Sequence, residues 1–139
     1  MSLDFFKKYE HKLKNKSQIK KLIGNYPRSR KVILCHGVFD VVHPGHVRHL
    51  AYAKSKADIL IASVTEDKFI NKGAYRPHIP EKIRALNLAA FEMVDYVFVD
   101  NQATPINSLK LIKPDYFAKG FEYTNNSVTT VSYTHLTLP

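Results

Sequence analysis

Apolar residues occur along this chain in two alternating patterns. Short continuous runs, rich in β-branched or aromatic residues, predict buried strands over residues 31–38, 58–64, 96–99 and 115–118. Apolar residues at helical spacing predict helices over residues 44–57, 80–93 and 104–112, of which the first two begin at a proline. Strands that are apolar on both faces and alternate with helices favour right-handed βαβ units. The pattern therefore predicts a single α/β domain, with a parallel sheet covered by helices on both faces.

The first 30 residues, which we call the arm, differ from the rest of the chain in charge. Residues 1–31 hold ten Lys and Arg against two acidic residues, so they carry +8 of the net charge of +9. Apolar residues, among them Ile19 and Ile23, recur at helical spacing until Gly24. A basic amphipathic helix of this kind could contact anionic lipid or RNA, or it could dock on the domain by its apolar stripe. Of these alternatives we expect docking.

Length and composition narrow the class of protein. The 139 residues suit one domain, and their 45% hydrophobic and 24% charged residues are typical of a globular protein. The single cysteine, Cys35, excludes an internal disulfide, and its apolar strand predicts an inert core thiol. No apolar run is long enough to cross a bilayer and no signal-peptide core is present, so we expect a cytoplasmic protein. We divide the chain into the arm, a domain over 31–123 and a tail over 124–139, whose lack of charged residues indicates a truncated or non-native ending.

The richest chemistry follows the first predicted strand. In parallel sheets ligands bind beyond the carboxyl ends of the strands, which directs attention to residues 36–46, 65–78 and 119–123. His43-Pro-Gly-His46 places two imidazoles around the first turn of a helix, where free backbone N–H groups and the helix dipole favour anions. Gly37 would let a ligand approach the backbone closely. This combination predicts a polyphosphate site.

Two other interpretations of these histidines stay open. His43, His46 and His49 at three-residue spacing could hold zinc, although no cysteine or carboxylate supports them at typical ligand spacing. The histidines could also be buried structural residues. His49 lies inside the predicted helix, so we expect a structural or surface role for it.

The segment from Gly37-Val-Phe-Asp40 to His43-Pro-Gly-His46 resembles the GxFDxxHxGH signature of the cytidylyltransferase-like nucleotidyltransferases. The resemblance extends over residues 31–123. Within the family, the sequence is most similar to the group of heptose-1-phosphate adenylyltransferases, and glycerol-3-phosphate cytidylyltransferase is a near relative. It implies a Rossmann-like domain that moves a nucleoside monophosphate from ATP or CTP onto a phosphorylated sugar or polyol and releases pyrophosphate. It also implies Mg²⁺ carried by the triphosphate, no metal held by the protein itself, and a homodimer, to which the apolar segment 91–99 could contribute.

The resemblance further implies roles for individual residues. Those expected to act in catalysis are His43, His46 and Lys72. Those expected to bind the nucleotide are Gly37, Val38, Phe39, Asp40, Gly45, Arg84, Lys119, Gly120 and Glu122. Those expected to bind the acceptor are Asp40 and Arg76. Lys72 and Arg76 could alternatively be solvated charges of a loop.

Three classes of function remain open at this point. The first is a nucleotidyltransferase, which needs no general base because a sugar phosphate is already an anionic nucleophile. The second is a nucleotide-binding module without activity, since the Ser/Thr-rich C-terminal element that the family uses to cap the site is missing from the sequence. The third is an RNA- or membrane-binding protein that uses the arm. We expect the first, with no nucleic acid as partner.

Overall fold

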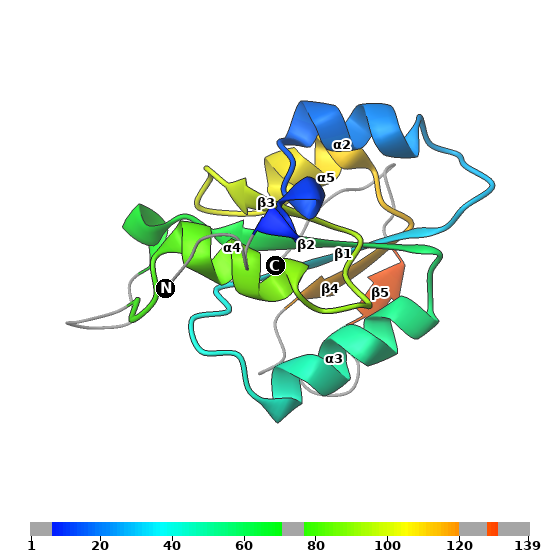
Figure 1. Cartoon of the computed structure of the whole chain (residues 1–139). Helices are drawn as coiled ribbons and strands as arrows, with labels where there is room; N and C mark the ends of the chain where they lie inside the picture. The colour runs from blue at the N-terminus through cyan, green and yellow to red at the C-terminus, as the bar shows by residue number, and fades with distance from the viewer. Residues whose placement is uncertain (1–6, 71–76, 120–127, 131–139) are drawn as a thin grey trace.

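The computed structural model describes residues 7–70, 77–119 and 128–130 (Figure 1). Its sheet has the strand order β3-β2-β1-β4-β5. The strands are β1 (Val32–Gly37), β2 (Ile59–Thr65), β3 (Tyr96–Asp100), β4 (Tyr116–Lys119) and β5 (Val128–Thr130). The first four are parallel and agree closely with the predicted strands, while β5 pairs antiparallel with β4. The predicted α/β class with a parallel sheet is confirmed, and β5 is an addition that the pattern of the tail did not indicate.

Within the described residues, four helices and two short 3₁₀ helices connect and precede the strands. They are η1 (Glu10–Lys12), α2 (Lys16–Ile23), α3 (Pro44–Ser55), η2 (Asp67–Phe69), α4 (Glu81–Ala89) and α5 (Ile106–Ile112). The prediction for α4 ran too far, to about residue 93. The helix ends earlier because tight turns follow it, in which Phe91 N–H bonds to Leu88 O and Val94 N–H to Phe91 O. These turns carry Val94 into the core, where it is fully buried.

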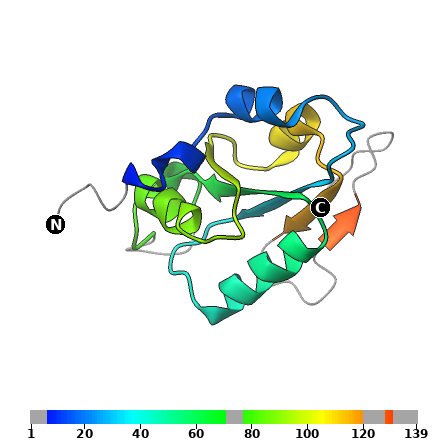
Figure 2. The ribbon, with the colours of Figure 1, turned by 45° about the vertical axis from the view of Figure 1, so that its right-hand side comes forward.

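The helices form one layer on each face of the sheet (Figures 1 and 2). Because side chains alternate along a strand, Ile33 and Cys35 of β1 face α3 and α4, whereas Val32 and Leu34 face α2 and α5. Each fully buried side chain of this kind stabilises the fold by roughly 1.5–3 kcal/mol. The two cores hold the sheet as a rigid support for the loops at its carboxyl edge.

The arm docks on the domain, as expected. Asn15 caps α2, since its Oδ1 accepts from Gln18 N–H at 2.8 Å while Gln18 Oε1 accepts from Asn15 N–H at 2.9 Å. Ile19 and Ile23 are buried against the sheet, and Lys14 N–H donates to Val97 O at 2.9 Å beside β3. The apolar stripe of the arm therefore forms part of the core.

Two further expectations concern surfaces. No helix among the described residues is long and apolar enough to cross a membrane.

The segment 91–99 was expected to contribute to a dimer, but its residues Val94, Val97 and Phe98 are buried within the chain. Its apolar character therefore serves the core, and the homodimer stays a prediction without support from this segment.

Candidate nucleotide site

The start of α3 is built around the two histidines. His43 has an extended backbone and caps the helix, with Pro44 at the first helical position. The Gly45 N–H donates to His43 Nδ1 at 3.0 Å, and the His43 N–H donates to His46 Nδ1 at 3.2 Å. Because each Nδ1 accepts a hydrogen bond, each neutral ring carries its proton on Nε2. The turn thus sets the tautomer and orientation of both imidazoles, whose centroids lie 4.2 Å apart.

The backbone N–H groups of this turn are not free, contrary to the expectation from sequence. The N–H of Gly45 is used by the His43 ring, and those of His46 and Val47 donate to His43 O at 2.9 and 3.2 Å. The reason is that a histidine at the cap supplies both a side-chain and a carbonyl acceptor to the first turn. The donors that the geometry offers to an anion are therefore the Nε2–H groups, together with the positive end of the helix dipole.

The ring of Phe39 packs against the ring of His46. Phe39 is buried, its ring centroid lies 5.6 Å from that of His46, and its φ of 52° is in the left-handed region that non-glycine residues rarely adopt. A Cβ on Gly37 would lie 3.0 Å from Phe39 Cε2. In the structure, Gly37 thus makes room for the Phe39 ring, while its predicted approach to a ligand stays a prediction.

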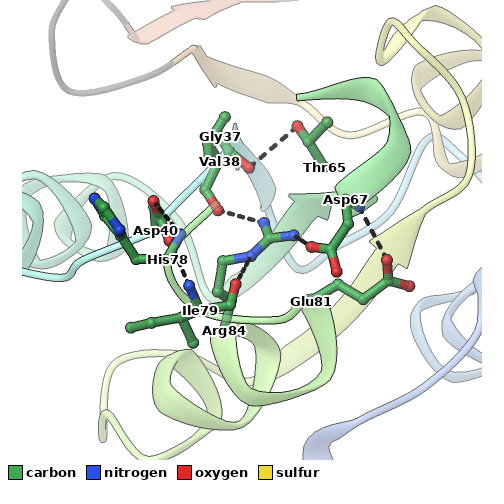
Figure 3. A network of polar contacts seen from close by, with 9 residues as sticks. All are labelled: Gly37, Val38, Asp40, Thr65, Asp67, His78, Ile79, Glu81 and Arg84. Carbon is green, nitrogen blue, oxygen red and sulfur yellow. Dashed lines mark hydrogen bonds and ion pairs between the residues drawn. The ribbon is translucent and has the colours of Figure 1, made fainter. Parts of the chain in front are cut away.

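Arg84 of α4 connects three segments of the chain: the loop after β1, the residues that precede α4, and η2 (Figure 3). Its Nε donates to Ile79 O at 2.8 Å, one terminal nitrogen donates to Val38 O at 2.7 Å, and the other is paired with the Asp67 carboxylate. The side chain is completely buried. Three of its five N–H donors hold protein acceptors in this structure, and the predicted contact of Arg84 with a nucleotide stays a prediction. Its contacts make it a positioning residue for the loop after β1.

Asp40 has a comparable arrangement (Figure 3). Its carboxylate is buried and accepts the backbone N–H groups of His78 and Ile79, both at 2.9 Å. These bonds join the loop after β1 to the segment that leads into α4. The predicted contacts of Asp40 with nucleotide and acceptor stay predictions, and the structure adds a role in holding the two loops together.

Sequence reasoning assigned no role to His36, although the structure places it at the centre of the carboxyl edge. Its Nδ1 lies 2.8 Å from Ser63 Oγ and its Nε2 lies 3.5 Å from Thr65 Oγ1, while Thr65 also donates to Gly37 O at 3.4 Å. The positions of these residues in the sequence could have indicated this cluster. His36 is the last side chain of its strand, and polar Ser63 and Thr65 interrupt an otherwise apolar strand beside it.

Lys119 ends β4, directly beside His36 in the parallel register. Its backbone is therefore at the same edge as the histidines, as the prediction requires. The other predicted site residues, Lys72, Arg76, Gly120 and Glu122, lie outside the described residues.

A groove of about 780 Å³ opens beside His43. It lies between the start of α3 and α4, and most of its lining is apolar, including Val47 and Phe91. His43, Arg48 and Asn87 contribute its polar groups. An apolar groove of this size with a few polar groups is typical of a small-molecule site.

The structure also bears on the zinc interpretation of the histidines and on the thiol of Cys35. Among the described residues, no group of three or more His, Cys, Asp and Glu is placed to hold a metal ion. Cys35 is completely enclosed in the core, and this burial raises the pKa of its thiol to about 12. The thiol is therefore protonated and unreactive at neutral pH, as expected.

Comparison with known proteins shows the family of the chain. The model of the family described as cytidylyltransferase-like matches residues 34–136, which is well over half of the chain. The chain belongs to the cytidylyltransferase-like family. The resemblance drawn from the HxGH segment is thereby confirmed, and the match extends beyond residue 123, where the resemblance was expected to end.

Two curated relatives are similar to this chain over most of its length. The chain is 33% identical over 130 residues to the bifunctional protein HldE of Campylobacter concisus, covering 92% of this chain and 27% of that protein. It is 43% identical over 101 residues to HldE of Helicobacter pylori, covering 71% of this chain and 22% of that protein. The chain thus spans about a quarter of the length of these curated relatives.

A solved structure shows the same fold. The lipopolysaccharide core biosynthesis protein of Thermoplasma volcanium aligns with a TM-score of 0.60 and 23% identity. The alignment covers 65% of this chain and 74% of that chain. The Rossmann-like architecture expected from the resemblance is therefore confirmed.

Proposed function

We propose that the chain is a nucleotidyltransferase that transfers a nucleoside monophosphate from ATP or CTP to a sugar phosphate of the heptose-1-phosphate type and releases pyrophosphate. The observation that carries the proposal is the histidine pair at the start of α3. Both rings are held by backbone hydrogen bonds to Nδ1 and therefore present Nε2–H as a donor. Membership of the cytidylyltransferase-like family supports the reaction class.

The reaction requires positioning and stabilisation of charge. An oxygen of the acceptor phosphate attacks the α-phosphorus and forms a new P–O bond, while the bond to the bridging oxygen breaks and pyrophosphate leaves with its electron pair. Negative charge spreads over the α-phosphate oxygens, where the Nε2–H groups of His43 and His46 would donate hydrogen bonds. A preorganised donor of this kind contributes a few kcal/mol at the transition state.

The residues fit a Mg²⁺ ion that arrives with the triphosphate. Asp40 already accepts two backbone N–H groups and Asp67 is paired with Arg84, so these carboxylates are engaged by the protein. When bound with the triphosphate, the ion would supply charge neutralisation to the phosphates during transfer.

The acceptor and the nucleotide are the open parts of the proposal. Similarity to HldE proteins favours ATP with a heptose phosphate, and glycerol-3-phosphate with CTP is the alternative. A non-catalytic nucleotide-binding module is the alternative from another class. A homodimer is part of the proposal and is tested by analytical ultracentrifugation.

The deciding experiment measures pyrophosphate release with ATP or CTP against heptose-1-phosphate or glycerol-3-phosphate. We expect release with one nucleotide–acceptor pair, and loss of release in His43→Asn, whose side-chain oxygen can still cap α3. His11→Ala is the matched control, since His11 is exposed and lies in the arm. Nucleotide binding without release for any pair would favour the non-catalytic module, and no binding of either nucleotide would contradict both.

A further inference from the structure

One layer of the protein carries most of the basic side chains. Residues 14–31 and 101–114, which contain α2, α5 and their connections, form what we call the basic layer. They hold seven and two Lys or Arg, respectively, and no Asp or Glu, although Lys16, Arg28 and Lys31 are paired with Asp100 and Asp115 beside them. The opposite layer is mixed, since residues 44–57 and 80–95 hold five basic and three acidic residues. Since α2 and α5 lie on the same face of the sheet (Figure 2), the excess of charge is concentrated on that face.

Part of this charge stabilises the fold. Arg28 donates to the carbonyls of Ile112 and Lys113 at the end of α5, and Lys20 Nζ donates to Leu111 O at 3.0 Å. Other basic side chains of this layer make no contact of this kind. The exposed ammonium groups of Lys21, Lys110 and Lys113 make no hydrogen bond or ion pair within the described part of the chain.

Large apolar side chains are exposed among these lysines. Leu22 and Tyr26 are each 44% exposed and Leu111 is 38% exposed. They make up three of the five large hydrophobic side chains that are exposed in the described residues. A shallow groove of about 430 Å³ between α2 and α5 joins Lys20, Lys21 and Leu111 in one surface.

This surface lies at the wrong end of the sheet to serve the nucleotide site. The ends of α2 and α5 lie where β1 begins, as Asp115 N–H bonds to Val32 O just after α5. The histidines follow the other end of β1, which a strand of six residues places roughly 20 Å away. At physiological ionic strength, the interaction between two exposed charges is largely screened beyond about 8–10 Å. The exposed lysines therefore contribute little to binding of a triphosphate.

We propose that the basic layer binds the surface of an anionic lipid bilayer. Lysines attract acidic headgroups, and leucine and tyrosine side chains beside them can enter the boundary between headgroups and acyl chains. Single-stranded nucleic acid would instead be expected to use several stacking aromatic side chains. Tyr26 is the only exposed aromatic residue of the described part of this layer, so the composition favours lipid.

The experiment measures co-sedimentation of the full chain with vesicles of phosphatidylcholine, alone or with roughly one third phosphatidylglycerol. We expect binding only to the anionic vesicles, weakened by salt. In the double variant Lys21→Glu/Lys110→Glu the affinity should fall at least about 30-fold, since each basic residue at such a surface contributes roughly a factor of five. Leu111→Ser should also weaken binding, by about fivefold, because it removes apolar area that enters the interface.

The matched control is Lys56→Glu/Lys82→Glu, which changes the same charge at exposed positions of the opposite layer. Circular dichroism confirms folding of each variant, and pyrophosphate release by Lys21→Glu/Lys110→Glu should equal that of the unmodified chain. Equal loss of vesicle binding in the two double variants would overturn the proposal, as would absence of binding to anionic vesicles. Tighter binding to a single-stranded oligonucleotide than to vesicles would also overturn it, in favour of a nucleic-acid surface.

Discussion

Replacement of Arg84 by methionine separates the two roles that sequence and structure assign to this residue. Methionine keeps much of the aliphatic volume and removes every donor. The carbonyls of Val38 and Ile79 would then lose their partners at 2.7 and 2.8 Å. A buried carbonyl without a donor costs about 1–3 kcal/mol. Asp67 is 39% exposed and can be solvated by water, so it adds little.

Both carbonyls are only partly buried, so each takes the lower end of this range, and the expected loss of stability is about 2 kcal/mol. For a domain of this size this loss lowers the Tm by roughly 7 °C. Calorimetry and urea titration measure the change, with Lys82→Met as the control because Lys82 is exposed in the same helix. Arg84→Lys retains a charge and part of the hydrogen bonding, so its Tm should lie between those of the native chain and Arg84→Met.

Nucleotide binding provides the second measurement. If Arg84 positions the loop after β1, affinity for the triphosphate should fall together with stability and recover partly in Arg84→Lys. A Tm within 2 °C or so of the native value, which corresponds to less than about 1 kcal/mol, would refute the reasoning from burial. If such a stable variant had also lost nucleotide affinity, the direct contact predicted from sequence would be the better account.

Three other predictions follow from the site and the core. His43→Ala or His46→Ala should lower turnover by about 10²-fold or more in a pyrophosphate-release assay, while circular dichroism shows the native fold; near-normal turnover in both would contradict the assignment. Gly37→Ala should destabilise the chain by about 1–2 kcal/mol in urea titration, since the new Cβ would lie 3.0 Å from Phe39 Cε2; unchanged stability would show that the ring can move aside. Burial raises the pKa of Cys35 from 9.0 to about 12, so above pH 9 the unfolded chain releases this proton before the folded chain does. Stability should therefore fall between pH 9 and 12 with a contribution of up to about 1.4 kcal/mol per pH unit that Cys35→Ala lacks; parallel pH profiles of the two proteins would contradict this.

Much of the fold could be predicted because its signals are local. The strand over residues 32–37 is apolar on both faces, and Pro44 marks the start of a helix. The site loop was found for the same reason, since its histidines are close together in the sequence. By contrast, β5 is a strand of three residues that exists through pairing with β4, and its sequence carries no alternation long enough to detect.

The contacts within the site could not be predicted to the same extent. Arg84 reaches Val38 across 46 residues of sequence, and Asp40 reaches Ile79 across 39. Nothing in the spacing of these residues says whether a charged side chain points toward a ligand or into the protein. The buried position of Arg84 follows from the packing of α4 on the sheet, and its contacts add a positioning role that the sequence did not indicate.

By itself, the sequence determined the α/β class, the location of the histidine turn of the candidate site and the basic character of the arm, because these depend on residue type and spacing. The tertiary structure decided which donors the turn offers. His43 and His46 accept backbone N–H groups through Nδ1, so each neutral ring carries its proton on Nε2, while the backbone amides of the turn already have acceptors. It also decided where the charge of the arm lies. Docking of Ile19 and Ile23 in the core places the lysines on a face remote from the histidines, since a helix that buries one side must expose the other.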